Sequence, residues 1–260
     1  MKHQNKLRIS LIQYDVIWED AKANQNYLDD LLKEHKSDII LLPEMFASGF
    51  SMNVDLIAEK PFGNSFQWMQ KKAKELNSAI AGSISTKEND KFFNRFYFVC
   101  PTGSIYIYDK KHLFSYGKEA GVYSAGDDIV TIDYKGWQIR PIVCYDLRFP
   151  VWIRNTKENP YDLILCNASW PKARREAWIS LLKARAIENM AFVAGVNRIG
   201  VDGYNLEYQG DSHLFNTLGQ DSEKINEHPE ILQFVIDKEE QDKTRQHFNF
   251  LNDRDSFYFG

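Results

Sequence analysis

The stretch "SDIILLPE" (residues 37–44) sets the pattern of the fold. Its apolar run from Ile39 to Leu42 is short and unbroken, and it ends at Pro43. Such a run, apolar on both faces, is typical of a strand that is covered on both sides. Apolar residues at helical spacing follow in "FGNSFQWMQKKAKELN" (62–77), and a further strand pattern follows in "SAIAGSIS" (78–85). The order predicts a strand–helix–strand unit.

A second unit of the same kind lies in the other half of the chain. "YDLILCNA" (161–168) predicts a strand, "REAWISLLKARAIENM" (175–190) an amphipathic helix, and "AFVAGVNR" (191–198) another strand. One such unit buries one face of its sheet, whereas two units packed sheet to sheet, with helices outside, bury both. We therefore predict the α/β class, and within it a four-layer α/β/β/α sandwich of two packed mixed sheets rather than a single doubly wound sheet.

The chain has 260 residues and no Pro/Gly/Ser-rich linker divides it, which predicts one domain over 1–260. An aromatic-rich tail, "RQHFNFLNDRDSFYFG" (245–260), follows the last predicted strand, "EILQFVID" (230–237). Left in water, this tail would form an exposed apolar patch. We expect the segment from about 238 to 260 to pack on its own domain or on the partner of a homodimer.

The composition excludes several classes of partner. The net charge is −4 and the basic residues do not gather in one region, so we expect no nucleic-acid partner. The run "LRISLIQY" (7–14) is too short for a signal sequence or a membrane span, so we expect a cytoplasmic protein with no membrane contact. Three widely spaced cysteines without a CxxC pair, and six scattered histidines, predict neither a disulfide nor a metal site.

The stretch "RPIVCYDLRFP" (140–150) contains the first candidate for chemistry, Cys144. The predicted strand "WQIRPIVC" (137–144) delivers this cysteine to a strand end, shortly before a predicted short helix. Helix N–H groups lower the pKa of a nearby thiol and favour the thiolate, which is the nucleophile. The alternative is a small buried hydrophobic residue. Cys100 and Cys166 lie in strand-like runs without polar neighbours, and we expect both in the core.

Further candidates follow other predicted strands. Glu44 stands directly after its strand, where α/β sheets build their sites, and is either a general base or an exposed loop acid. Lys110 and Lys111 follow "GSIYIY" (103–108); a lysine at this place can stabilise an oxyanion or can simply be surface charge. The neighbouring His112 offers another solution, a Cys–His dyad with the thiol.

Four motifs together resemble the nitrilase superfamily of carbon-nitrogen hydrolases. They occur in this order, each at a strand end or in the loop after it: "LLPE" (41–44), "YDKKHLF" (108–114), "KEAG" (118–121) and "VCYDLRFP" (143–150). The likeness runs nearly from end to end, and it implies the four-layer fold and no cofactor or metal.

The resemblance also implies roles for particular residues. The family's lysine stands two residues before the histidine, which selects Lys110. Glu44 would be the general base, Lys110 the oxyanion holder and Cys144 the nucleophile. Glu119 would be the second, supporting glutamate, and the Tyr145 N–H would complete the oxyanion hole.

A finer likeness points to the omega-amidase branch. It rests on "CYDLRFPVWIRN" (144–155), "NASWP" (167–171) and "GDSHLFN" (210–216). The branch implies a small-molecule amide substrate: the terminal amide of an acid of the 2-oxoglutaramate or 2-oxosuccinamate type, hydrolysed to the acid and ammonia through a cysteine thioester. The alternatives are an N-carbamoyl amino acid hydrolase, another aliphatic amide or nitrile hydrolase, a Cys–His thiol hydrolase, and a ligand-binding sandwich.

Such a substrate also requires a cation for its carboxylate. The candidates are Arg148, Lys172, Arg174, Arg175 and Arg198, for each of which a salt bridge outside the site is the alternative. We favour Arg148. Trp170, in the loop "NASWPKARRE" (167–176), is expected either to form a wall of the pocket or to pack in the core.

Overall fold

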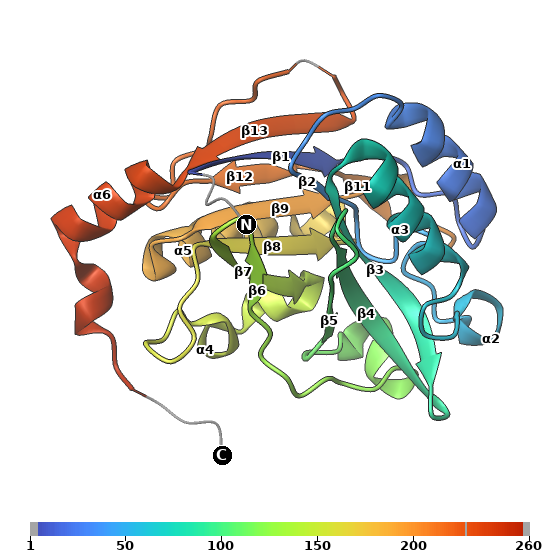
Figure 1. The fold of residues 1–260 in the computed structure, drawn as a ribbon. Helices are drawn as coiled ribbons and strands as arrows, with labels where there is room; N and C mark the ends of the chain where they lie inside the picture. Colours follow the sequence, from blue (N-terminus) through green and yellow to red (C-terminus); the bar gives the residue numbers. More distant parts are fainter. Residues whose placement is uncertain (1–4, 227, 257–260) are drawn as a thin grey trace.

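Two mixed β-sheets pack face to face in the computed structural model, and helices cover their outer faces (Figure 1). The structure describes residues 5–226 and 228–256. The arrangement confirms the predicted four-layer α/β/β/α sandwich.

The first sheet has six strands in the order β13-β1-β2-β3-β4-β5. Its centre, β1-β2-β3, is parallel, and the pairings toward both edges are antiparallel. The strands are β1 (Lys6–Ile12), β2 (Ile39–Leu41), β3 (Ala79–Glu88), β4 (Lys91–Val99), β5 (Ile105–Asp109) and β13 (Ile231–Asp237).

The second sheet has five strands in the order β12-β9-β8-β7-β6, and its centre, β9-β8-β7, is parallel. A small antiparallel hairpin, β10–β11, lies beside the two sheets. The strands are β6 (Ile132–Tyr134), β7 (Trp137–Val143), β8 (Leu163–Ala168), β9 (Phe192–Asn197), β10 (Ile199–Val201), β11 (Glu207–Gln209) and β12 (His213–Phe215).

The helices lie outside the sheets. They are α1 (Ala21–Leu31), α2 (Val54–Ile57), α3 (Asn64–Leu76), α4 (Pro150–Ile153), α5 (Arg175–Asn189) and α6 (Lys238–Phe248). The 3₁₀ turns are η1 (Ser115–Gly117), η2 (Glu119–Gly121), η3 (Cys144–Arg148), η4 (Lys172–Arg174) and η5 (Phe250–Asp253). In the described part of the chain, no helix has the length and apolarity needed to cross a membrane.

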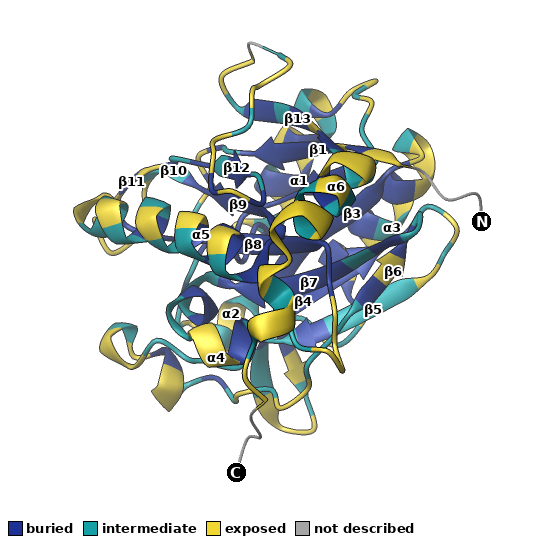
Figure 2. Cartoon of the chain, turned by 90° about the vertical axis from the view of Figure 1, so that its left-hand side faces the viewer, coloured by how far each residue is buried: buried dark blue, intermediate teal, exposed yellow. Residues whose placement is uncertain are grey.

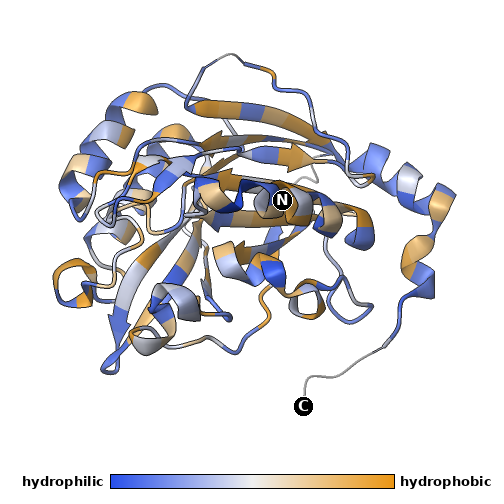
Figure 3. Ribbon diagram, turned by 180° about the vertical axis from the view of Figure 1, so that it is seen from behind, coloured by the Kyte–Doolittle hydropathy of each residue, from blue (hydrophilic) through white to orange (hydrophobic). Residues whose placement is uncertain are grey.

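Successive side chains of each strand point to opposite faces of the sheet, so each strand contributes to two apolar layers. On β2, Ile39 and Leu41 belong to the core between the sheets, whereas Ile40 belongs to the apolar layer under α1 and α3. Phe98 of β4 and Tyr134 of β6 meet across the two sheets with ring centroids 5.2 Å apart. Figure 2 shows the strands largely buried and the outer helix surfaces exposed, and Figure 3 shows the matching apolar bands along the strands. This double burial is what the unbroken apolar runs predicted.

The tail after β13 packs on its own chain as far as the structure describes it. The Gln241 side chain of α6 is buried and donates to the Asp162 carbonyl oxygen at 2.8 Å, and Arg245 forms an ion pair with the Asp162 carboxylate at 2.9 Å. Phe248 and Phe250 remain 41% and 56% exposed. Residues 257–260 of the predicted aromatic tail lie outside the described residues.

Candidate active site

Four segments that follow strands meet at one place in the molecule. Glu44 follows β2, Lys110 follows β5, Cys144 follows β7 and Ser169 follows β8. The parallel register β7–β8, with Val143 opposite Asn167, brings the ends of these two strands together. The ends of strands from both sheets therefore supply the site, as expected for α/β folds.

A fully buried ion cluster forms the base of the site. Lys110 Nζ lies 2.8 Å from Glu44 Oε1 and 2.9 Å from each carboxylate oxygen of Glu119, and all three side chains have no exposed surface. Asn94 Nδ2 donates to Glu44 Oε1 at 2.8 Å and to Glu119 Oε1 at 3.1 Å. The Ser169 N–H donates to Glu44 Oε2 at 2.9 Å. Each charge is thus paired and hydrogen-bonded, which a buried ion requires.

The cluster fixes the charge of its lysine. Burial disfavours the ammonium form of Lys110, but Glu119 and Glu44 outweigh burial and raise its pKa well above the usual value. Burial raises the pKa of Glu119, and Glu44 adds to that effect while Lys110 opposes it. Lys110 is therefore a permanent cation at neutral pH, suited to stabilise an oxyanion.

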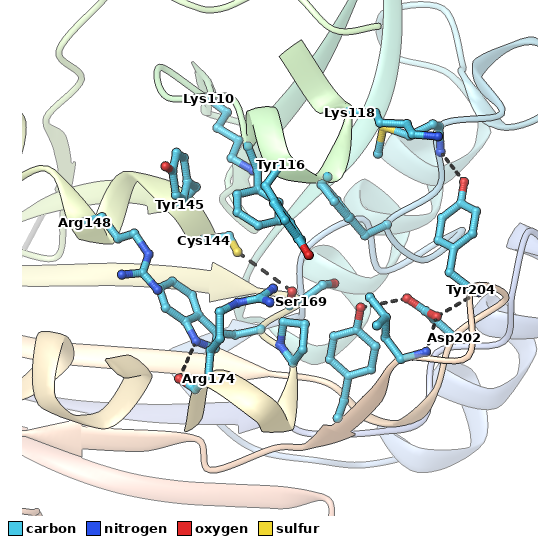
Figure 4. Close-up of a pocket in the computed structure, with 18 residues that line it drawn as sticks. Lys110, Tyr116, Lys118, Cys144, Tyr145, Arg148, Ser169, Arg174, Asp202 and Tyr204 are labelled. Atoms are coloured by element: carbon cyan, nitrogen blue, oxygen red, sulfur yellow. Dashed lines mark hydrogen bonds between the residues drawn. The ribbon is translucent and has the colours of Figure 1, made fainter. Parts of the chain in front are cut away.

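Cys144 is the first residue of η3 and adopts a left-handed backbone conformation with φ 45°. For a residue other than glycine this conformation costs about 1–3 kcal/mol and often marks a functional site. Its Sγ lies 4.0 Å from the Ser169 carbonyl oxygen, at the cavity seen in Figure 4. The sharp turn directs the thiol away from the strand and into the cavity.

The expected lowering of the thiol pKa is wrong. Burial raises the pKa of Cys144 well above its usual value, the Glu44 carboxylate raises it further, and Lys110 only partly opposes them. The first turn of η3 is too weak a positive field to offset these effects. The resting Cys144 side chain is therefore a neutral thiol, which would need a base to become a nucleophile.

A cavity of about 500 Å³ opens above the cluster. Aromatic and aliphatic side chains form most of its wall, and its cations are Lys110, Lys118, Arg148 and Arg174. Asp202 also lines it, but its carboxylate accepts bonds from the Tyr204 and Leu206 N–H groups and from the Tyr208 hydroxyl. The aromatic and aliphatic members of the wall are Phe50, Met52, Phe114, Tyr116, Tyr145, Trp170, Pro171, Tyr204, Leu206 and Tyr208.

The structure separates the predicted site residues into two groups. Lys110, Cys144, Tyr145, Arg148 and Trp170 all line the cavity. Tyr145 is the second residue of η3, at the start of a helical turn, where backbone N–H groups have no intrahelical partner.

Other candidates lie elsewhere. Lys111 pairs with Asp127 at 2.6 Å. His112 stacks on Phe149, with centroids 3.7 Å apart, and its Nδ1 lies 2.8 Å from Asp146 Oδ1. His112 does not line the cavity.

Three of the five candidate cations for the substrate carboxylate have acid partners outside the cavity. Lys172 pairs with Glu207 at 2.9 Å, Arg175 with Asp211 at 2.9 Å and Arg198 with Asp15 at 2.8 Å. Arg148 and Arg174 alone among the five line the cavity.

Some residues of the site were not predicted. Asn94 bridges the two glutamates, and its signal in the sequence was a polar residue within the apolar strand "FFNRFYFVC" (92–100). Ser169 holds Glu44 through a backbone N–H, which no side-chain pattern reveals. The β10–β11 turn with Tyr204 reaches the cavity from a distant part of the chain.

The sequence profile described as carbon-nitrogen hydrolase matches residues 8–246. The chain belongs to this family. The carbon-nitrogen hydrolase is 45% identical to the omega-amidase YafV of Escherichia coli K12 over 82% of this chain and 83% of that protein. It is 31% identical to a 2-oxoglutaramate amidase of Bacillus subtilis over 95% and 97% of the two chains.

A solved structure supports the same membership. XC1258 from Xanthomonas campestris, described as a CN-hydrolase superfamily protein with an arsenic adduct in its active site, superposes with a TM-score of 0.94. It is 42% identical, and the match covers 99% of this chain and 100% of that chain. This member of the nitrilase superfamily is an amidohydrolase that acts on carbon–nitrogen bonds, and it is similar to omega-amidases.

Proposed function

We propose that this amidohydrolase removes the terminal amide of a small carboxylic acid of the 2-oxoglutaramate or 2-oxosuccinamate type, and releases ammonia through a cysteine thioester. The observation that carries the proposal is the 2.8 Å Glu44–Lys110 ion pair beside the cavity that Cys144 lines. The names of two relatives, an omega-amidase and a 2-oxoglutaramate amidase, point to the same reaction.

The first half-reaction uses the neutral thiol and the buried base. Glu44 accepts the Cys144 proton while the sulfur attacks the amide carbonyl carbon. The resulting oxyanion accepts hydrogen bonds from the Lys110 ammonium and the Tyr145 N–H, and each such donor contributes about 3 kcal/mol to lowering the barrier. Protonated Glu44 then gives its proton to the leaving nitrogen, the C–N bond breaks and ammonia departs.

The second half-reaction regenerates the thiol. Water gives a proton to Glu44 and attacks the thioester carbonyl carbon, and the same two donors stabilise the second oxyanion. The C–S bond breaks, the sulfur recovers its proton from Glu44, and the free acid leaves. Glu119 accepts a hydrogen bond from Lys110 and Asn94 donates one to Glu44, and these bonds hold both groups in place throughout.

The decisive experiment measures ammonia release from a panel of substrates. We expect the kcat/KM for 2-oxoglutaramate to exceed that for N-carbamoyl amino acids, simple aliphatic amides and nitriles. We also expect that quenching at low pH traps the thioester, so that mass spectrometry finds Cys144 heavier by the mass of the acyl group. Cys144→Ala is the blank and Cys100→Ala, a buried cysteine in the core, is the matched control. Substantial ammonia release by Cys144→Ala would refute the mechanism, and a preference for a carbamoyl substrate would move the protein to another branch.

A Cys–His thiol hydrolase is the alternative mechanism. It predicts that His112→Ala abolishes activity and Lys110→Met spares it. His112 contacts Asp146 and Phe149, so we expect His112→Ala to keep activity and Lys110→Met to lose it.

A further inference from the structure

We propose that Arg148 and Arg174 form a paired subsite that binds the distal carboxylate of the substrate, with Trp170 as the platform for Arg148 and Phe114 as the platform for Arg174. The inference rests on the proposed function and names the residues that would give it specificity for acids. The chain's other candidate cations are excluded by their own acid partners.

Both guanidinium groups lie over aromatic rings of the cavity wall. Arg148 Cζ is 4.7 Å from the centroid of Trp170, and Arg174 Cζ is 5.3 Å from the centroid of Phe114. Stacking occupies the faces of a guanidinium and leaves its N–H edge for a planar anion. Within residues 5–226 and 228–256, neither guanidinium forms a salt bridge or donates a hydrogen bond, and both side chains are half-buried.

Trp170 contacts both arginines: its ring lies under the Arg148 guanidinium, and its indole N–H binds the Arg174 backbone. The Trp170 indole Nε1 donates to the Arg174 carbonyl oxygen at 2.9 Å, and the Trp170 backbone N–H donates to Asn197 Oδ1 at 2.8 Å. Arg148 closes η3, the turn that Cys144 begins. Figure 4 shows Arg148 and Arg174 on the same side of the cavity, next to Cys144. A carboxylate held there leaves the other end of a short chain to reach the thiol.

The charges around the cavity support an anionic group. Asp202 is the acidic side chain among the lining residues, and three donors already satisfy its carboxylate. Two half-buried arginines without acid partners are costly unless an anion joins them. A pair of guanidinium forks matches the two oxygens of one carboxylate better than the single ammonium of Lys118 does.

The test compares two substrates of equal chain length: glutaramate, which carries the distal carboxylate, and pentanamide, which lacks it. We expect Arg148→Ala and Arg174→Ala each to lower the glutaramate-to-pentanamide ratio of kcat/KM at least about tenfold, since each removes charged hydrogen bonds. Arg175→Ala, the adjacent arginine bound to Asp211, is the matched control and should leave the ratio unchanged. An equal loss on both substrates, or a ratio that falls only in Lys118→Ala, would overturn the proposal.

A binding measurement separates this inference from the reaction itself. Glutarate, a dicarboxylate with no amide, is titrated calorimetrically into Cys144→Ala with and without Arg174→Ala. Binding that weakens at least tenfold on loss of Arg174 supports the subsite even if no amide is hydrolysed. Equal binding by the two proteins refutes it even if 2-oxoglutaramate proves to be the substrate.

Discussion

A single buried cation organises the chemistry at the residue scale. Lys110 lies between two carboxylates, and all three side chains are excluded from water. Because charges are costly to bury, each depends on the others for its ionised form. The same carboxylate that balances Lys110 also disfavours the Cys144 thiolate. The cluster therefore keeps a permanent cation beside a neutral thiol.

Replacing Lys110 should destabilise the fold in a pH-dependent way. In Lys110→Met, Glu44 and Glu119 face each other without a cation, and we expect a loss of about 3–5 kcal/mol at pH 8. The pKa of Glu119 is already raised by burial and would rise further. A carboxyl whose pKa is higher in the folded state contributes most stability at low pH and loses it as the pH rises. Urea unfolding should therefore show a smaller loss at pH 5.5 than at pH 8; equal losses would contradict this.

Replacing Glu44 should separate thiol reactivity from turnover. We expect Glu44→Gln to lower kcat about 10²- to 10⁴-fold, because it removes the proposed general base. The same change removes a negative charge that raises the Cys144 pKa, so more thiolate should form at pH 8. Alkylation of Cys144 by iodoacetamide should then become faster and its pH midpoint lower. Glu176→Gln, at an exposed site on α5, is the control, and slower alkylation of Glu44→Gln would contradict the electrostatics.

At the scale of elements, turns that follow strands deliver each functional group. The β10–β11 hairpin contributes in a different way, since its turn closes one side of the cavity. The turn packs tightly on Trp18, because a Cβ on Gly203 would come within 2.3 Å of Trp18 Nε1. Tyr204 of the same turn meets the Trp18 ring edge-on, with ring centroids 5.1 Å apart. Asp202 fixes the conformation of the turn from inside.

Loss of the Asp202 carboxylate should loosen this turn. In Asp202→Ala the Tyr204 and Leu206 N–H groups and the Tyr208 hydroxyl lose their acceptor. Because the turn forms part of the cavity wall and not the reacting cluster, we expect KM to rise about tenfold with a smaller change in kcat. Hydrogen exchange of the amides at 204–206 should accelerate. Asp128→Ala, at an exposed acid outside the hairpin, is the control; an unchanged exchange rate would show that the carboxylate does not hold the turn.

The whole molecule depends on the apolar layer between its two sheets. Strands of both sheets contribute to one continuous cluster, so the inner faces of the two sheets share a single core. We expect a single cooperative unfolding transition for this reason. The tail adds a second feature, since α6 is fixed to the domain through Asp162 but leaves Phe248 and Phe250 partly exposed.

We expect these exposed aromatic side chains to take part in a homodimer. Light scattering after size exclusion should give twice the 30.3 kDa of the chain for the unmodified protein. Phe250→Asp should shift the population toward the monomer, because it places a charge in an apolar contact. Leu56→Asp replaces another exposed apolar residue, 62% exposed on α2, and should not. A monomeric unmodified protein would contradict the prediction.

Much of the fold was predictable because burial on both faces leaves a direct trace in sequence. "IILL" (39–42) and "LILC" (163–166) are apolar without alternation, as expected for strands covered by a second sheet and by helices. Strand bounds are harder to read from the sequence: the strand-like stretch "DIVTIDY" (128–134) forms a strand only over β6. The short helix predicted after Cys144 is α4, Pro150–Ile153.

The sequence by itself determined the layers, the family and the motifs that contain Glu44, Lys110 and Cys144, since these depend on local patterns along the chain. Only the tertiary structure decided which of five basic residues reach the cavity, because that depends on whether each meets an acid partner brought from another segment. It also decided the protonation of Cys144. The pKa of that thiol is raised by burial and by Glu44, which lies a hundred positions away in the chain. A local sequence pattern cannot show that two such distant residues come close in the folded protein.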